Sequence, residues 1–310
     1  MSSATISGPT VGGKALLGPM RVPFLLLDPA CVALGAATAF WGTGSLNLWY
    51  VILVLIGAIA AHISVNALNE YFDYRSGLDM HTQRTPFSGG SGTLPSEPKM
   101  ERPALIIGLV GLGVAAIIGI YFLFKVGLGL LPLGLLGLIV VYVYTVWLTR
   151  QPLLCLFAPG VGFGLLMVMG TDFVLRGAYS WTGFFASLVP TFLVSNLLLL
   201  NQFPDVEADR AIGRRHFPIL IGRRRSSLIY GAFLLLAYLS IVAGVLLGVL
   251  PPAALLGLLT SPWAVKAARG AYRYADDIGN LVPIMGLNVL ITILTPALTA
   301  VGLFLAGFLD

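Results

Sequence analysis

Two short stretches hold the side chains of this sequence whose types and spacing are best suited to chemistry. One reads NALNEYFDYRSGLD over residues 66–79, and the other reads NQFPDVEADRAIGRR over residues 201–215. Each places an Asn four residues before an Asp, and each comes at the end of a long apolar run. In a chain that otherwise avoids charge, this concentration of carboxylates indicates a functional site.

If both stretches are helical, their polar side chains form two stripes, because residues three, four, seven and eight apart share one face of a helix. The stripes are Asn66, Asn69 and Asp73 in the first stretch, and Asn201, Asp205 and Asp209 in the second. Asp79 comes six residues after Asp73 and would leave the stripe, but Gly77 offers a place for the helix to end. We therefore expect Asp79 on a loop beside the end of that helix.

Clustered carboxylates without matching His or Cys ligands favour a hard, oxygen-coordinated ion. Mg²⁺ in particular binds through a few carboxylates together with the phosphates of a substrate. Arg84, Arg214 and Arg215 follow the two clusters, and arginine holds phosphate through forked hydrogen bonds. The four aspartates carry about −4, two Mg²⁺ ions carry +4 and a diphosphate adds about −3, which three arginines would offset. The residues therefore predict a site for Mg²⁺ and a diphosphate.

The elements that must position these residues are membrane helices. With 57% hydrophobic residues, 10% charged residues and a mean hydropathy of +0.92, this chain of 310 residues cannot cover a globular surface with polar groups. Apolar runs of about 20 residues recur, each long enough to cross a bilayer as a helix. We predict an all-α, polytopic membrane protein, a bundle of about nine transmembrane helices. The predicted spans are 22–43, 47–70, 103–124, 127–148, 153–175, 180–202, 227–249, 250–267 and 281–308.

The N-terminal segment differs from the rest of the chain in composition. Residues 1–20 are rich in Ser, Thr, Gly and Pro, so we expect a disordered cytoplasmic tail there, followed by a single transmembrane domain over residues 21–310. Cys31 and Cys155 both fall within predicted spans, and two such cysteines make no disulfide framework.

Basic residues predict the orientation in the membrane. With nine spans, sixteen of the eighteen Lys and Arg residues fall on one side, which the positive-inside rule assigns to the cytoplasm. Ten of the thirteen acidic residues fall on that side too, so both acidic stretches open at the same membrane surface. The net charge of +5 then reflects membrane topology, and we expect no nucleic-acid partner. We predict an integral protein of a prokaryotic inner or cell membrane, with its N-terminus and active site cytoplasmic.

At these residues the sequence resembles the UbiA superfamily of intramembrane prenyltransferases, whose members carry aspartate-rich motifs after the second and sixth helices of a nine-helix bundle. NEYFDYRSGLD, followed by QRTPFSGGSGTLP, is most similar to the branch that prenylates 1,4-dihydroxy-2-naphthoate on the way to menaquinone. NQFPDVEADRAIGRR is similar to the second motif of that branch, and Tyr144 and Thr145 resemble a family position at the mouth of the active site. Glu70 is a departure, since many relatives have Asp or an uncharged residue there.

The resemblance implies a polyprenyl diphosphate as donor, an aromatic acceptor, and a mechanism through an allylic cation that the acceptor ring attacks. It implies that Mg²⁺, as two ions, is held by Asn69, Asp73, Asp79, Asn201, Asp205 and Asp209. It implies further that Arg84, Arg214 and Arg215, with the two asparagines, contact the diphosphate, that the four aspartates are catalytic, and that Asn66 and Tyr144 face the acceptor. An apolar channel open to membrane lipid would hold the isoprenoid tail and exclude water.

Two sets of alternatives stay open from the sequence. The alternative acceptors are 4-hydroxybenzoate, another quinone or tocopherol precursor, and a glycerol-phosphate lipid. In a different class, the protein would be a divalent-cation transporter with an acidic mouth. Transporters usually bind their ions near the bilayer midplane on broken helices, whereas these carboxylates gather at one membrane face.

Other polar residues have two readings each. His81 and His216 lie beside the acidic stretches, as plain loop residues or as acceptors of a proton from the substrate. Within the spans, we expect His62, Asn196 and Asn288 to form hydrogen bonds with neighbouring helices, and Asp172 to form a local ion pair with Arg176. Asp28, just inside the first span, is a further candidate for the cavity. The Gly-Ser run FSGGSG, residues 87–92, is a candidate lid or hinge.

Overall fold

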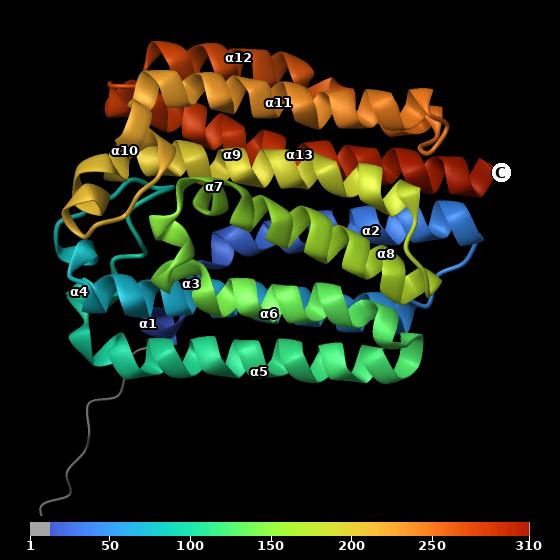
Figure 1. Ribbon diagram of the computed structural model, residues 1–310, viewed down its shortest axis with the longest axis horizontal. Coiled ribbons are helices and arrows are strands. Elements are labelled where there is room, and N and C mark those ends of the chain that lie inside the picture. The colour runs from blue at the N-terminus through green and yellow to red at the C-terminus, as the bar shows by residue number, and fades with distance from the viewer. Residues whose placement is uncertain (1–12, 310) are drawn as a thin grey trace, which may run out of the picture.

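The computed structural model describes residues 13–309, and over this range the chain is helical and has no β-strand. Figure 1 shows long, roughly antiparallel helices packed side by side, which confirms the all-α prediction. The long helices are α2 (Leu27–Thr43), α3 (Leu48–Arg75), α5 (Glu101–Val126), α6 (Leu131–Val146), α9 (Trp181–Ala211), α11 (Arg223–Leu246) and α13 (Ile278–Leu309). A further span is made of α7 (Pro152–Val161), a π-helical segment over Gly162–Val168 and α8 (Met169–Arg176). The shorter helices are α1 (Gly13–Leu17), α4 (Thr93–Ser96), α10 (Phe217–Ile221) and α12 (Ser261–Arg273).

Eight segments within residues 13–309 are long and apolar enough to cross a membrane, so the chain is an integral membrane protein. The predicted ninth span, 250–267, is the one that does not qualify. There a 3-10 segment over Pro252–Thr260 leads into α12, because Pro262 starts a new helix, and Lys266 makes that helix less apolar. The two pieces still pack against α11 and α13, and Figure 1 shows α12 alongside α11.

The N-terminal segment is described only in part. The predicted disordered tail covers residues 1–20, of which residues 1–12 lie outside the described range. The next residues form α1 instead, and Ala15 packs on a small apolar cluster with Leu94 and Met100. The chain is therefore already docked on the bundle before its first span.

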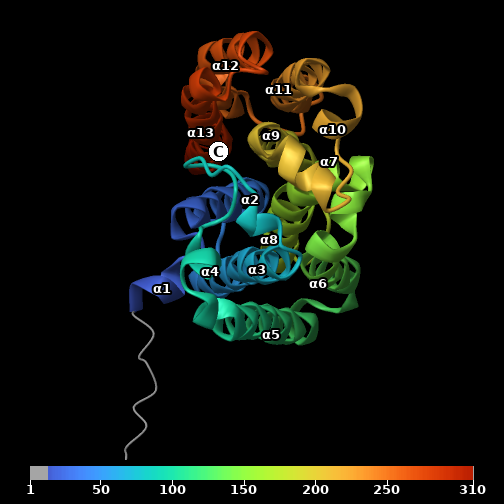
Figure 2. The same ribbon diagram turned by 90° about the vertical axis from the view of Figure 1, so that its left-hand side faces the viewer.

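The bundle has one densely packed side and one thin side. Figure 2 looks onto the end where α3 and α9 finish, and α9 lies near the centre with α11, α12 and α13 beyond it. In the span that contains α9, 67% of the most apolar 18-residue stretch is buried inside the molecule, against 6% in the span that contains α6. The largest apolar cluster joins α2, α9, α11 and α13, whereas α5 and α6 pack mainly on α3. The space between the two sides is where a cavity forms.

Local sequence explains where the two motif-bearing helices begin and end. The side chain of Asn47 accepts a hydrogen bond from the backbone N–H of Tyr50 and caps α3, and Ser180 caps α9 in the same way. Gly77 adopts a left-handed φ of 80° after the end of α3, as its position predicted. The turn delivers Asp79 to a short 3-10 segment, Leu78–Met80, beside the helix end.

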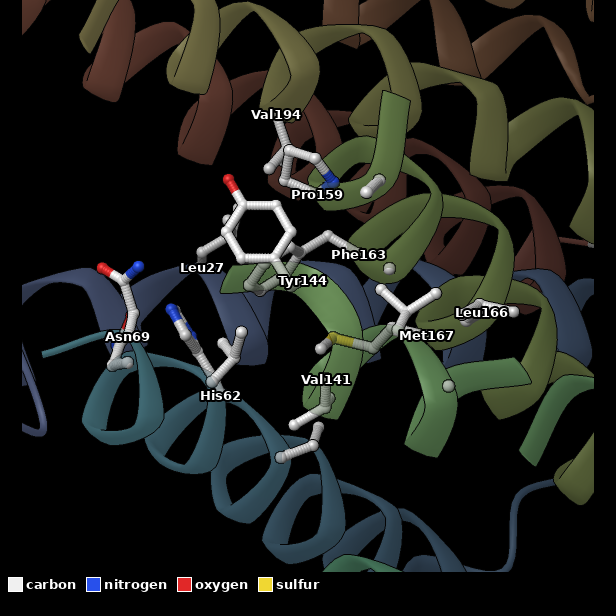
Figure 3. A pocket seen from close by; sticks show the side chains of 18 of the residues that line it. Leu27, His62, Asn69, Val141, Tyr144, Pro159, Phe163, Leu166, Met167 and Val194 are labelled. Carbon is white, nitrogen blue, oxygen red and sulfur yellow. The ribbon is translucent and has the colours of Figure 1, made fainter. Parts of the chain in front are cut away.

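The break between α7 and α8 shapes the cavity wall. Pro159 lies inside α7 and removes a helical hydrogen bond, and the π-helical turns follow it. Gly160 lies so close to α9 that an added Cβ would be 1.9 Å from the backbone oxygen of Thr191. This contact seats the broken helix against α9 and turns Phe163 and Met167 toward the cavity, as Figure 3 shows.

Candidate active site

The ends of α3 and α9 meet at one end of a cavity of about 580 Å³. Both helices finish at the left-hand end of Figure 1, so residues far apart in sequence become neighbours. The cavity is lined there by six predicted site residues, Asn69, Asp73, Asp79, Asn201, Asp205 and Asp209. The two acidic stretches therefore form one site, as their common membrane face requires.

Arg214 joins the two stretches. Its Nη2 donates to Oδ1 of Asp73, and its Nη1 donates to Oδ1 of Asp209 at 2.9 Å. Burial opposes the charge of this guanidinium, but the negative charges of Asp73 and Asp209 outweigh it and raise the pKa of Arg214. One cation thus sets the spacing of two carboxylates that come from different helices.

Three oxygens among the predicted metal ligands lack partners within the described residues. Oδ2 of Asp79, Oδ1 of Asn201 and Oδ1 of Asp205 are buried and make no hydrogen bond within the described residues. Burial, together with the negative charges of Asp73 and Glu70, raises the pKa of Asp79 to about 7. Buried polar atoms without partners are costly, so these three oxygens are suited to a ligand that the fold itself does not supply.

A magnesium ion fits this set of donors. All of the predicted ligands offer oxygen, the donor that Mg²⁺ prefers, and three of the oxygens have no partner. Within residues 13–309, however, no three Asp, Glu, His or Cys side chains are grouped closely enough to hold a metal alone. Mg²⁺ commonly completes its shell with water and substrate phosphates, so the site suits a metal that arrives with a diphosphate.

His216 completes the surroundings of Asp209. It is buried, and its Nε2 lies 2.9 Å from Oδ2 of Asp209, whereas its Nδ1 has no partner within the described chain. Both oxygens of Asp209 are thereby engaged, one by Arg214 and one by His216. The structure therefore favours a positioning role for His216.

A glycine-rich loop, residues 81–92, crosses the end of the bundle where α3 and α9 finish, as Figure 2 shows, and part of it, including residues 87–90, lines the cavity. The backbone of Gly89 lies beside Asp205, and Ser91 donates to Glu70 from both the backbone N–H, at 2.6 Å, and the side chain, at 3.0 Å. Phe87 packs on α13 near Gly286, where an added Cβ would lie 3.3 Å from the ring. The loop predicted as a lid therefore bridges both motifs in this structure.

Arg21 was not among the residues identified from the sequence. Its guanidinium lines the cavity and donates twice to Oε1 of Glu70, at 3.0 and 2.9 Å. Its backbone has φ 49°, a left-handed conformation that is uncommon for any residue except glycine. Glu70, the residue that departs from the family pattern, anchors this cation and the loop. No spacing in the sequence links residues 49 positions apart, so only the tertiary structure reveals the contact.

Arg84, Arg215 and His81 do not line the cavity. Arg84 is exposed on the loop and donates to the backbone oxygen of Asp79 at 3.3 Å. Arg215 is exposed, and its backbone N–H binds the carbonyl of Thr149. His81 is exposed as well. Of the three arginines predicted for a diphosphate, Arg214 alone has its side chain in the site in this structure.

The residues predicted to face the acceptor do line the cavity. Figure 3 shows Asn69 extending from α3 toward the ring of Tyr144 on α6, and Nδ2 of Asn69 donates to Oγ1 of Thr145 at 3.2 Å. Asn66 also lines the cavity, but its Nδ2 donates to the backbone oxygen of Met20 at 3.1 Å. Asn66 is thereby tied to the segment that precedes the first span.

Beyond these polar residues the cavity is an apolar channel. It follows α3 from Asp73 back to Val54, a rise of about 29 Å for 19 residues of helix. Leu123, Leu130 and Val174 line its far end, near the opposite membrane face. A long hydrocarbon chain could lie along this channel with its polar head at the aspartates.

His62 is the exception in the apolar part. Its Nδ1 lies 3.0 Å from Oδ2 of Asp28 on α2, so it does bond a neighbouring helix as expected, and it also lines the cavity. Asp28 is fully buried behind it and does not line the cavity. Asn196 and Asn288 are structural: Asn196 donates to the backbone oxygen of Tyr230, and Tyr230 donates to Asn288.

Comparison with known proteins places this architecture in context. Residues 29–280 match the model of the UbiA prenyltransferase family. A 1,4-dihydroxy-2-naphthoate octaprenyltransferase of Bacillus subtilis (strain 168) is 25% identical over 245 residues, covering 77% of this chain and 76% of the relative. One of the same name from Escherichia coli (strain K12) is 28% identical over 301 residues, covering 94% and 96%. The solved structure of a UbiA homologue from Archaeoglobus fulgidus bound to DMAPP and Mg²⁺ superposes with a TM-score of 0.61, at 15% identity, over 93% of this chain and 98% of that one.

Proposed function

This chain is a prenyltransferase of the UbiA family, and we propose that it transfers a polyprenyl group from an allylic diphosphate to 1,4-dihydroxy-2-naphthoate. One observation carries the proposal. The two aspartate motifs converge at one end of a single cavity, and the rest of that cavity is an apolar channel along the membrane helices. A charged head joined to a long hydrocarbon tail is the kind of ligand that such a cavity fits. Family membership also argues against the cation-transporter alternative.

The diphosphate would lie between the motifs. Arg214 has five N–H donors and uses two of them on Asp73 and Asp209, so three remain for phosphate oxygens. Arg21 brings a second cation to the same end of the cavity. In this structure Arg84 and Arg215 are exposed, and their part in diphosphate binding would require the loops that carry them to close over the substrate.

Asn69, Asp73, Asp79, Asn201, Asp205 and Asp209 would hold Mg²⁺, and the charge balance favours two ions. Support comes from the unpartnered oxygens of Asp79, Asn201 and Asp205, and from the homologue solved with DMAPP and Mg²⁺. Bound there, the metal would supply positive charge that stabilises the departing diphosphate. The protein contributes the spacing of the carboxylates, which Arg214 fixes from within.

Cleavage of the allylic C–O bond would leave a carbocation at the head of the channel. Water must be kept away from it, and two features of the chain serve that purpose. The 81–92 loop covers the mouth, held by Ser91 on Glu70, and below the polar end the walls are almost entirely apolar. The aromatic ring then attacks the cation and forms the new C–C bond.

The acceptor is proposed from the relatives. The Bacillus subtilis and Escherichia coli relatives are both named for 1,4-dihydroxy-2-naphthoate, and the motif NEYFDYRSGLD is most similar to that branch. The other acceptors considered above, 4-hydroxybenzoate among them, remain the comparison compounds for an assay.

We place the site at the cytoplasmic face of the membrane. The positive-inside rule supports this orientation, because the loops at the motif end of the bundle carry Lys99, Arg150, Arg214 and the run Arg223–Arg225. The N-terminus would then be cytoplasmic as well, since α1 precedes the first span at that end.

An assay of the purified protein tests the function. The protein in detergent is given Mg²⁺, a labelled polyprenyl diphosphate and a panel of aromatic acceptors, and both lipid-soluble product and released pyrophosphate are followed. We expect magnesium-dependent product with 1,4-dihydroxy-2-naphthoate and its loss with EDTA. Product with 4-hydroxybenzoate alone would overturn the acceptor assignment, and the absence of product with every acceptor would overturn the proposed function.

A further inference from the structure

The pair formed by His62 and Asp28 is a polar site within the apolar channel that the metal and diphosphate chemistry does not use. His62 lies on the same face of α3 as Asn69 and Asp73, eleven residues before Asp73, which is a rise of about 16 Å. It is therefore too deep to reach a metal at the aspartates. It lines the cavity on the same wall as Asn69, so an aromatic ring seated beside Asn69 and Tyr144, the residues predicted to face the acceptor, would lie between His62 and the aspartates.

The tautomer of His62 follows from its contact with Asp28. Nδ1 lies 3.0 Å from Oδ2 of the carboxylate, which accepts a hydrogen bond and cannot donate one when it is ionised. The Nδ1 proton therefore points at Asp28, and Nε2 carries a free lone pair. Within the described chain Nε2 makes no hydrogen bond, and Figure 3 shows the imidazole projecting into the cavity below Asn69 and Tyr144.

Among the described residues, His62 is the group that faces the buried carboxylate of Asp28. Asp28 is fully buried, and within residues 13–309 its Oδ1 has no hydrogen-bond partner and no Lys or Arg forms an ion pair with it. An imidazolium formed at His62 and the ionised carboxylate of Asp28 would together carry no net charge. The other titratable side chains nearby are Cys31, which follows Asp28 on α2, and Tyr144 across the cavity.

We propose that His62, oriented by Asp28, accepts the hydroxyl proton of the aromatic acceptor as its ring attacks the allylic carbon. This role rests on the proposed prenyl transfer. The C–O bond to the diphosphate breaks, and its electron pair leaves on the diphosphate. The O–H electron pair moves into the ring, the ring forms the C–C bond, and the proton goes to Nε2. The immediate products are the neutral keto form of the prenylated ring and an imidazolium paired with Asp28.

The ring edge of Phe163 helps to hold the base in place. Its centroid is 4.8 Å from that of the imidazole, with the planes at 79°, so His62 is fixed between Asp28 on one helix and an aromatic ring on another. A general base needs this kind of support, because proton transfer requires contact at hydrogen-bond distance. The two histidines beside the motifs are less suited: His216 faces Asp209, and His81 is exposed.

The test is single-turnover transfer with a series of ring-substituted acceptors whose hydroxyl groups differ in acidity. We expect His62→Gln to slow transfer about 100-fold with the least acidic acceptor, while the KM for the polyprenyl diphosphate stays within about threefold of wild type. The defect should shrink as the acceptor becomes more acidic, because an acceptor that enters already ionised needs no base. His81→Gln, the same change at an exposed histidine outside the cavity, should match wild type.

Asp28→Asn provides the second variant and should slow transfer about tenfold through a less well oriented imidazole, with the same dependence on acceptor acidity. A defect that is constant across the acceptor series would indicate a structural role and overturn the proposal, as would wild-type rates in His62→Gln. If the wild-type protein transfers the prenyl group and the His62→Gln variant does so at the same rate, the role of His62 as the base is refuted and the prenyl transfer stands. Failure of the wild-type protein with every acceptor refutes the prenyl transfer and the base together.

Discussion

Buried carboxylates lie at both ends of this bundle, Asp172 at one end and the motif aspartates at the other, and their surroundings differ. At the end away from the motifs, both oxygens of Asp172 are engaged. Oδ1 accepts from Thr38 at 2.9 Å and lies 3.4 Å from Nε of Arg176, and Oδ2 accepts from Ser180 at 2.6 Å. At the motif end, Asp79 and Asp205 each keep a buried oxygen with no partner in the described chain.

The difference is the one expected between structural acids and acids that meet a ligand. Asp172 ties α8 to α2 and to the start of α9, and its local ion pair with Arg176 is the one that the four-residue spacing predicted. Asp79 and Asp205 each have one buried oxygen without the hydrogen bond that would offset the cost of its burial. Under the proposed function, the open oxygens of Asp79 and Asp205 would meet a ligand, whereas those of Asp172 already hold helices together.

Replacing Asp205 should have the largest effect. Asp205→Asn keeps the shape of the side chain but removes a charge that would meet the metal, so we expect transfer to fall about a thousandfold. The melting temperature should stay close to wild type, because this side chain contributes little packing. Product formation and thermal unfolding, measured on the same preparation, check the expected rate and the expected melting temperature. Activity near wild type would remove Asp205 from the proposed metal site.

Replacing Arg214 should have an intermediate effect. Arg214→Gln removes the cation between Asp73 and Asp209 and leaves fewer donors for the diphosphate. A hydrogen bond to a charged group contributes about 1.5–3 kcal/mol, so the KM for the polyprenyl diphosphate should rise about 10- to 100-fold. Arg215→Gln is the matched control, since the neighbouring arginine is exposed in this structure. An equal rise in KM for the control would show that the loop closes on substrate.

Replacing Asp172, at the end away from the motifs, should lower stability and leave the transfer rate almost unchanged. Asp172→Asn leaves one of its two donor partners, Thr38 or Ser180, without an acceptor, and should cost about 1–3 kcal/mol of stability. Thermal unfolding in detergent should show a lower melting temperature, while the rate per folded molecule stays within about twofold. A selective loss of activity without loss of stability would contradict the structural assignment.

The smallest effect is expected within the second motif itself. Glu207 lies between Asp205 and Asp209, but its side chain is 71% exposed and pairs with Arg210 at 2.8 Å. An exposed pair of this kind contributes about 0–1 kcal/mol. Glu207→Gln should therefore change neither the rate nor the melting temperature measurably. A large change in the transfer rate would mean that burial does not distinguish the acids of the proposed site from other acids.

Much of the site could be predicted from spacing along the chain. Asn69, Asp73, Asp205 and Asp209 recur at helical intervals, and an α-helix fixes which side chains share a face whatever surrounds it. The turn at Gly77 that delivers Asp79 was also predictable, because glycine readily takes the left-handed conformation. Arg84 and Arg215 were harder to place, since sequence proximity to a motif does not say which way a loop side chain points.

The sequence by itself determined that this protein is a helical membrane bundle whose acids gather at one face, because composition and periodicity act on each segment locally. Tertiary structure alone decided which side chains complete the site. Glu70 reaches Arg21 and Ser91, Arg214 joins two helices, and His62 meets Asp28 across the channel. These contacts depend on how separate helices pack, and no pattern along a single chain segment records that packing.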